Sequence, residues 1–258
     1  MLGPVSGAGF LPPATALAAP EIAAEAPASN AAAAGFGLDL AKGSDFVAQT
    51  NFVQCVGASM QMMLNIMSAR DDRTASTQSR LQVLARSLSG PTRTGFTRQG
   101  ASVTGWTAGL NQLDAGPYRL VGAANLTEAL RLAATSIRET GKPVGLLVWA
   151  GRHAWVMSGF RATADPRRTT DFQVTSAVVL DPLYPNRSGR WGPSPKPRQA
   201  LTPTQLGRQF VPRRGGTWAG APIGPDGAPV TSAFAGRYVI VMPFIPVEIV
   251  RSDRHVAF

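Results

Sequence analysis

The apolar pattern of this chain changes once, near residue 141, and that change constrains the fold more than any other feature. Before it, residues 55–69 contain no proline and carry apolar side chains at the spacing of one helix face, namely Val56, Met60, Met63, Leu64 and Met67. After it, short apolar runs at 143–149, 153–160 and 172–181 predict strands, the first two as a hairpin. Helices followed by strands are typical of an α+β domain and not of alternating βαβ units.

A second well-delimited helix is predicted over residues 125–140. Asn125 is a favourable N-cap, and Gly141 favours an end to the helix. Weaker patterns of the same kinds predict two helices and a last strand, at 75–88, 103–113 and 237–242 respectively.

The chain divides into a low-complexity segment, residues 1–38, and a single expected domain, residues 39–250. The first segment is rich in Ala, Pro and Gly and buries too little apolar surface to offset the entropy of ordering it, so it is interpreted as a leader or a tether. Residues 16–19 resemble a secretory cleavage site, which favours a secreted or cell-surface protein over the alternative, a cytoplasmic one. Within the domain, residues 184–236 form a Pro-, Gly- and Arg-rich insertion.

The net charge is strongly positive and unevenly distributed. The formal charge is +10, and residues 150–220 contribute +8 of it, with eleven Arg or Lys against three Asp. This excess predicts an anionic surface partner, with solvated loops as the alternative. No basic helix with interleaved aromatic residues accompanies the charge, so nucleic-acid binding is not favoured. Neither a transmembrane segment nor a metal or cofactor is predicted, because the apolar runs are short and one Cys with two His is too few for the usual zinc site.

The only cysteine, Cys55, is predicted at the start of the first helix. A helix N-terminus presents unpaired N–H groups that favour the thiolate, the nucleophilic form of a cysteine. A buried cysteine packed as a small hydrophobe is the alternative. Gln49, six residues earlier, can bring its side-chain amide beside the thiol as an oxyanion donor, and Gln54 competes for that role.

A base for this thiol is predicted at His153, which begins a strand directly after the turn at Gly151-Arg152. Asp181 ends the following strand and can hold the imidazole in the useful tautomer. The alternatives are a half-buried His bonded to the backbone and an Asp that only begins a turn before Pro182. The second histidine, His255, lies in a charged tail and is interpreted as solvated.

Three neighbours of His153 have two interpretations each. Trp149 and Trp155 can wall a substrate cleft, but aromatic residues in a hairpin are more often core, and the core is favoured here. Arg152 can bind a carboxylate of a substrate, although a solvated turn residue is the favoured interpretation.

Several segments together resemble a known family. The segment from Gln49 to Met60, QTNFVQCVGASM, resembles the opening of papain-like cysteine peptidases, including the Gln–Cys spacing. A closer resemblance is to the bacterial peptidases that trim double-glycine leaders from bacteriocin precursors, and it rests on GKPVGLLVW (141–149), HAWVMSGF (153–160) and VLDP (179–182). The likeness extends over about residues 46–184. Val56 stands where many relatives have Gly or Trp, and the insertion has no counterpart.

The resemblance implies a papain-like fold, in which the helix that begins at the Cys packs on a C-terminal antiparallel sheet. It also implies a cysteine peptidase that acts on a peptide or protein without a cofactor. The implied roles are nucleophile, base, orienting carboxylate and oxyanion donor for Cys55, His153, Asp181 and Gln49. Two other functions stay open: an acyltransferase or transglutaminase-type enzyme with the same residues, and an inactive papain-like module that binds through its basic surface.

Overall fold

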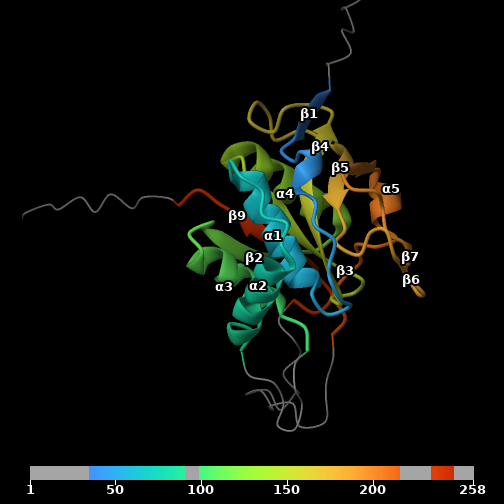
Figure 1. Ribbon diagram of the computed structural model, residues 1–258. Coiled ribbons are helices and arrows are strands. Elements are labelled where there is room, and N and C mark those ends of the chain that lie inside the picture. Colours follow the sequence, from blue (N-terminus) through green and yellow to red (C-terminus); the bar gives the residue numbers. More distant parts are fainter. Residues whose placement is uncertain (1–34, 91–98, 216–233, 247–258) are drawn as a thin grey trace, which may run out of the picture. The chain divides into compact units, whose positions relative to one another are not determined.

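The computed structural model describes residues 35–90, 99–215 and 234–246 of the chain, which form a mixed α+β fold (Figure 1). The helices are α1 (Cys55–Met67), α2 (Ala75–Ser87), α3 (Val103–Gln112), α4 (Leu126–Thr140) and the short α5 (Pro203–Leu206). The main sheet contains β1 (Phe36–Asp39), β2 (Tyr118–Ala123), β3 (Val144–Val148), β4 (His153–Ala162), β5 (Val174–Leu180), β8 (Gln199–Leu201) and β9 (Tyr238–Pro243). A separate small hairpin consists of β6 (Arg187–Ser188) and β7 (Gly192–Pro193).

The sheet is antiparallel throughout the described ranges. Its strands follow the order β2-β9-β3-β4-β5-β8, and β1 pairs with the second half of β4. The predicted hairpin is present as β3 and β4, which pair directly across the turn. The first residue of β4 and the residue after β5 therefore lie at the same end of the sheet, because neighbouring antiparallel strands run in opposite directions.

Helices cover both faces of the sheet. Successive residues of its central strands point to opposite faces, so neighbouring residues belong to two different buried clusters. Leu146 and Trp155 belong to a buried cluster with residues of α4, whereas Leu147 and Ala154 belong to a cluster with residues of α1 and α3. On the second of these faces, α1 packs on β4, α3 packs on β2, and α2 packs on both helices. None of the helices in the described ranges combines the length and apolar character needed to cross a membrane.

The helix that carries Cys55 is held in place by methionine side chains. Met60, Met62 and Met63 are fully buried in the cluster between α1 and the sheet. Unbranched methionines fill irregular spaces well, so this face adapts to the sheet beneath it. The helix begins at Cys55, as its sequence pattern predicts.

The loop before Cys55 is fixed by two buried glutamines of α2. Gln78 accepts a hydrogen bond from the N–H of Thr50 at 2.8 Å and donates one to the carbonyl of Ala48 at 3.0 Å. Gln82 donates to the carbonyl of Val53 at 2.9 Å. Buried amide groups that satisfy loop backbone in this way hold the approach to α1 in one conformation.

Most predicted elements lie close to their expected ranges, and the α+β assignment is confirmed. Five strands were not predicted: the short β6, β7 and β8 of the insertion, β2, and β1, where Phe36 packs on Phe160 with ring centroids 5.7 Å apart. Residues 36–38 therefore belong to a strand and not to the leader, so the folded part begins before residue 39. Residues 1–34 of the leader, 216–233 of the insertion and His255 lie outside the described residues.

Candidate functional site

The thiol of Cys55 lies at the first residue of α1, half-buried and outside any disulfide. The first N–H groups of a helix have no carbonyl partner within it, so they place partial positive charge beside this sulfur. The preceding residue, Gln54, does not cap them, because its side chain bonds to Thr50 and Ser79 instead. A partly exposed sulfur at a helix start can be reached by a substrate and is favoured as a thiolate.

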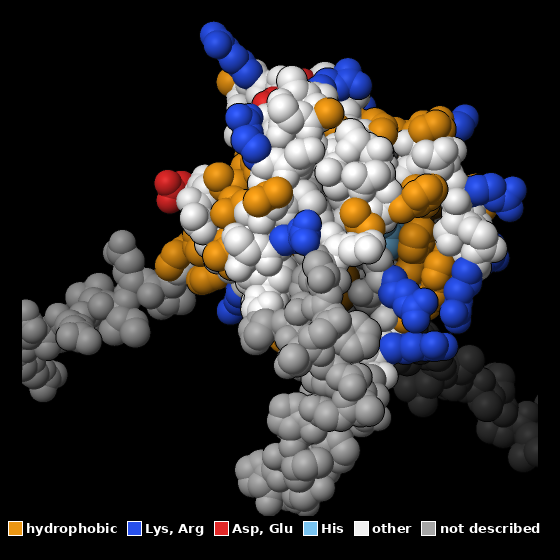
Figure 2. Space-filling view, turned by 60° about the horizontal axis from the view of Figure 1, so that its bottom comes forward, with side chains coloured by type: hydrophobic (Ala, Val, Ile, Leu, Met, Phe, Trp, Pro, Cys, Tyr) orange, Lys and Arg blue, Asp and Glu red, His pale blue; other side chains and the backbone are white. Residues whose placement is uncertain are grey.

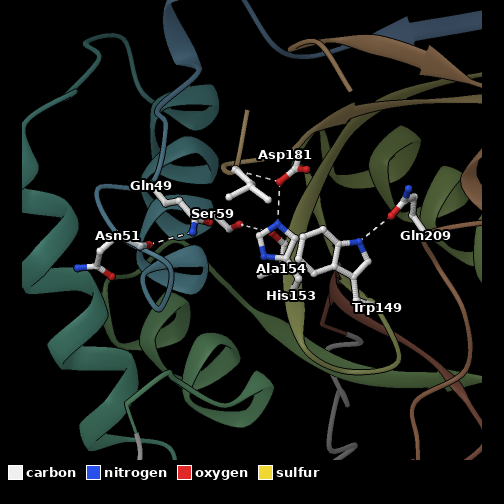
Figure 3. Close-up of polar contacts among 9 residues, drawn as sticks. Gln49, Asn51, Ser59, Trp149, His153, Ala154, Asp181 and Gln209 are labelled. Carbon is white, nitrogen blue, oxygen red and sulfur yellow. Dashed lines mark hydrogen bonds and ion pairs between the residues drawn. The ribbon is translucent and has the colours of Figure 1, made fainter. Parts of the chain in front are cut away.

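His153 and Asp181 form a buried pair at the ends of two adjacent strands. His153 opens β4 and is 4% exposed, and Asp181 follows β5 and is 0% exposed. Nε2 of the ring lies 2.7 Å from Oδ1 of Asp181, and the same oxygen accepts the N–H of Leu183 at 2.8 Å (Figure 3). The carboxylate is thus held by the backbone, and it holds the imidazole in turn.

The pKa of His153 is raised above the usual value of an imidazole. Burial of the ring lowers its pKa, but the interactions of the ring with Asp181 and Cys55 outweigh burial, and they raise the pKa of His153 to about 9. Nε2 is bonded to Asp181, so Nδ1 is the ring nitrogen that remains for the contact with the thiol of Cys55. A thiol, an imidazole and a carboxylate therefore lie in sequence, the arrangement of an activated cysteine nucleophile.

A hydrogen bond between α1 and β4 fixes the thiol relative to the imidazole. Oγ of Ser59, about one helical turn after Cys55, donates to the carbonyl of Ala154 at 3.1 Å, and both residues are buried (Figure 3). Ala154 directly follows His153 in the chain. Ser59 was not singled out from the sequence, where the only signal is a serine on an otherwise apolar helix.

Gln49 extends from the loop beside α1 toward His153 (Figure 3). Its backbone N–H donates to the carbonyl of Pro182 at 2.7 Å, so this loop is joined to the segment that follows Asp181. Its side-chain nitrogen donates to the carbonyl of Asn51 at 2.9 Å. A primary amide nitrogen carries two N–H groups, so one donor remains for a bound group.

One face of the imidazole is covered by Trp149. The two rings are stacked, with centroids 4.0 Å apart and an angle of 20° between their planes. Trp149 lies in the turn between β3 and β4, where it, Ala150 and Gly151 have φ angles of +57°, +56° and +96°. Left-handed backbone is costly for residues with a Cβ, so this turn needs support from elsewhere in the chain.

That support comes from the insertion. The carbonyl of Gln209 accepts the backbone N–H of Trp149 at 2.9 Å, and its side-chain Oε1 accepts the indole N–H at 2.6 Å. Gln209 also donates to the carbonyl of Trp191 at 2.6 Å, and the ring of Trp191 is parallel to that of Trp149 within 2° at 6.4 Å. Trp149 therefore covers the imidazole and also packs, half-buried, against the core cluster, so both of its interpretations hold in part. Trp155 is fully buried in the core, as expected.

Removing the side chain of Gln209 is expected to slow the alkylation of Cys55 by about tenfold, because a lost hydrogen bond of this kind is worth ~1–2 kcal/mol. Without it the indole N–H is unpaired, the turn loosens and the imidazole loses its fixed orientation. The measurement is the rate of iodoacetamide labelling of Gln209→Ala as a function of pH. The matched control is Gln205→Ala in α5, whose side chain accepts the N–H of Thr202. Equal slowing in both variants contradicts a role for Gln209 in positioning His153.

The site opens into a hollow on the surface. Figure 2 shows the pale blue of a histidine in this hollow, with hydrophobic side chains along one side and Lys and Arg side chains gathered at the edge. His153 is the only histidine in the described ranges. The hollow therefore leaves a small part of the imidazole open to the surface.

All four residues singled out from the sequence, Gln49, Cys55, His153 and Asp181, lie at one end of the sheet, although the amide of Gln49 is bonded to the loop. The residues that support them, Ser59, Trp149, Trp191 and Gln209, carry no pattern that assigns them to the site. Comparison with protein-family models finds no family that matches the chain, and no curated protein matches it.

Proposed function

We propose that this chain is a cysteine peptidase with a papain-like fold, in which Cys55 attacks an amide carbonyl. One observation carries the proposal: the imidazole of His153 interacts with both the thiol at a helix start and a buried carboxylate, 2.7 Å away at Asp181. Burying a charged pair costs desolvation energy that stability alone rarely recovers. Such a pair beside a half-buried thiol is typical of a catalytic site.

The architecture supports the papain-like assignment. The helix that begins with Cys55 packs on an antiparallel sheet, whose neighbouring strands carry His153 and Asp181 at one end. The order along the chain is Gln, Cys, His, Asp, as in the family that the sequence resembles.

The proposed reaction begins when the thiolate of Cys55 attacks the carbonyl carbon of the scissile bond. The oxygen becomes an oxyanion, to which the backbone N–H of Cys55 and the second side-chain N–H of Gln49 donate. His153, charged because its pKa is about 9, gives its Nδ1 proton to the amine as the C–N bond breaks, which leaves a thioester on Cys55. The neutral imidazole then takes a proton from water, whose oxygen attacks the thioester carbonyl, expels the thiolate of Cys55 and releases the acid.

The same residues would also serve transfer of the acyl group to an amine, which differs only in what attacks the thioester. The identity of the product separates these two enzymes. An inactive binding module is distinguished from both enzymes by the reactivity of its thiol. Its Cys55 is not expected to react faster than free cysteine at acidic pH.

The first test is the reactivity of Cys55, which is simple to measure because the chain has no other thiol. At pH 6, iodoacetamide is expected to label Cys55 at least tenfold faster than free cysteine, since the charged imidazole favours the thiolate and free cysteine is less than ~1% ionised there. The control is His153→Ala, which should label no faster than free cysteine. A test peptide is then incubated with the unsubstituted chain, and its products are identified by mass. Labelling of Cys55 at the rate of free cysteine would contradict the enzyme.

A further inference from the structure

The basic charge of residues 150–220 separates into different regions of the fold. Arg161 lies near the end of β4 that is opposite His153, and Arg168 follows in the next loop. Arg198 is paired with Asp39 at 2.9 Å beside them. A second group lies around the turn that precedes His153, and its members are Arg152, Arg190, Arg208 and Arg214. We call this group the arginine rim.

Two members of the arginine rim belong to the turn itself. Arg152 directly precedes His153 and is exposed. Arg214 is also exposed, and its backbone N–H donates to the carbonyl of Ala150 at 3.2 Å, so it runs alongside the turn. The backbone that carries both guanidinium groups therefore lies at the turn, next to His153.

The other two members flank the aromatic wall beside the imidazole. The guanidinium carbon of Arg190 lies 5.3 Å from the ring centre of Trp191, which is parallel to Trp149. Arg208 lines a cavity of about 360 Å³ together with Trp191 and Gln209. The indole surface of Trp191 thus lies beside positive charge. Figure 2 shows orange and blue side chains near the pale blue histidine.

No carboxylate in the described ranges is ion-paired with any member of the arginine rim. Arg138 and Arg198, by contrast, each have an aspartate partner. Asp181, which lies at the same end of the sheet, is fully buried and bonded to His153. Like charges that surround a hollow without internal partners attract an anionic ligand to it.

We propose that the substrate of this site is an acidic peptide, whose Asp or Glu side chains bind the arginine rim beside the scissile bond. The substrate role rests on the proposed peptidase, and the binding preference does not. Guanidinium groups bind carboxylates in a two-pronged geometry, and indole surface suits the apolar parts of a peptide. The rim flanks one turn and does not follow an extended path along which a nucleic-acid backbone could run, which favours a peptide.

The binding test uses the full-length Cys55→Ala chain, so that hydrolysis does not interfere. Two fluorescent peptides of equal length differ only in carrying Glu or Gln at several positions, and their affinities are measured by anisotropy at physiological ionic strength. The Glu peptide is expected to bind about tenfold more tightly, as two exposed ion pairs at the upper end of their usual strength would give. Equal binding of the two peptides overturns the proposal.

Matched variants distinguish a local site from general attraction by the positive chain. Arg152→Gln/Arg214→Gln is expected to weaken binding of the Glu peptide about tenfold. Arg161→Gln/Arg168→Gln removes the same charge from the opposite end of β4 and should change binding less than about twofold, since exposed charges beyond ~10 Å are screened. Equal losses overturn the site, and so does a single-stranded oligonucleotide that binds the rim more tightly than the Glu peptide.

Hydrolysis by the unsubstituted chain separates this proposal from the peptidase on which it rests. If the Glu and Gln peptides are cleaved at equal rates, the acidic preference is wrong and the peptidase stands. If neither peptide is cleaved but the rim variants selectively lose affinity for the Glu peptide, the proposed peptidase is contradicted and the acidic binding site stands.

Discussion

Replacing Asp181 by Ala is expected to lower kcat/KM for peptide hydrolysis by about 10³-fold or more, the scale seen when an orienting carboxylate is lost from a catalytic triad. Asp181 has two effects on His153. It accepts from Nε2 at 2.7 Å, which fixes the ring, and its charge helps to raise the pKa of the imidazole. Without it burial dominates, the pKa falls, and the thiolate loses its charged partner.

An Asn at position 181 separates these two effects. Asp181→Asn keeps an oxygen that accepts from Nε2 and from the N–H of Leu183, both of which Oδ1 of the aspartate now accepts. It removes the charge while an accepting oxygen stays in place, and the fall in kcat/KM is expected to approach that of Asp181→Ala, with the pH profile of Cys55 alkylation shifted. The profile and kcat/KM are measured together, because a change in orientation alone does not move the profile.

The control for both variants is Asp165→Ala. Asp165 forms a two-pronged ion pair with Arg138, with both hydrogen bonds 2.8 Å long. It follows the end of β4 that is opposite His153. The hydrogen bond with Arg138 lowers the pKa of its carboxylate to about 2. Loss of this pair should alter kcat/KM less than about twofold, since it reaches neither the thiol nor the imidazole. Equal effects of Asp165→Ala and Asp181→Ala contradict a catalytic arrangement at Asp181.

The titration of His153 is expected to lower the free energy of unfolding by up to about 3 kcal/mol between pH 6.5 and pH 9. A thiolate at Cys55 offsets part of this fall, because the unfolded chain keeps the thiol proton up to about pH 8.5. The pKa of His153 is raised from 6.5 to about 9 in the folded chain. Below pH 6.5 both the folded and the unfolded chain hold the proton, and its full stabilising effect is present. Between the two values the folded chain keeps a proton that the unfolded chain releases, so stability declines as the pH rises.

Urea denaturation at closely spaced pH values measures this decline. His153→Gln is the control, because it removes the titrating ring and should flatten the curve in this range while leaving the effects of other groups in place. Ionisation of the thiol acts on stability in the same range with the opposite sign, so the curve of Cys55→Ala is measured as well. If neither chain loses stability between pH 6.5 and pH 9, the raised pKa of His153 is contradicted, and the thiolate then has no cationic partner there.

Features carried by a few neighbouring residues were predictable from the sequence. The helix that starts at Cys55 follows from the spacing of its apolar side chains, and the strand that starts at His153 follows from the glycine turn before it. Strand β2 was missed because Arg119 and Gly122 interrupt its apolar character, and its pairing with β9 supplies what local preference lacks.

Contacts between distant segments could not be predicted in this way. No periodicity joins Ser59 to Ala154, which lies 95 residues later, or Trp149 to Gln209 in a segment dominated by Pro, Gly and Arg. Charge shows the same limit, since the sum over residues 150–220 does not reveal which arginines surround the imidazole. The residues of the candidate site could therefore be proposed one by one from the sequence, whereas the contacts that support them are visible only in the fold.

The hydrogen bond between Ser59 and Ala154 has a consequence for when the proposed enzyme can act. The thiol belongs to the helical half of the domain, and the imidazole and carboxylate belong to strands made much later in synthesis. Until those strands dock on α1, a growing or partly unfolded chain holds an ordinary thiol and no charged partner for it. Hydrolytic activity would then report completed folding, and a cell making this protein would be spared premature cleavage of its own peptides without needing an inhibitor.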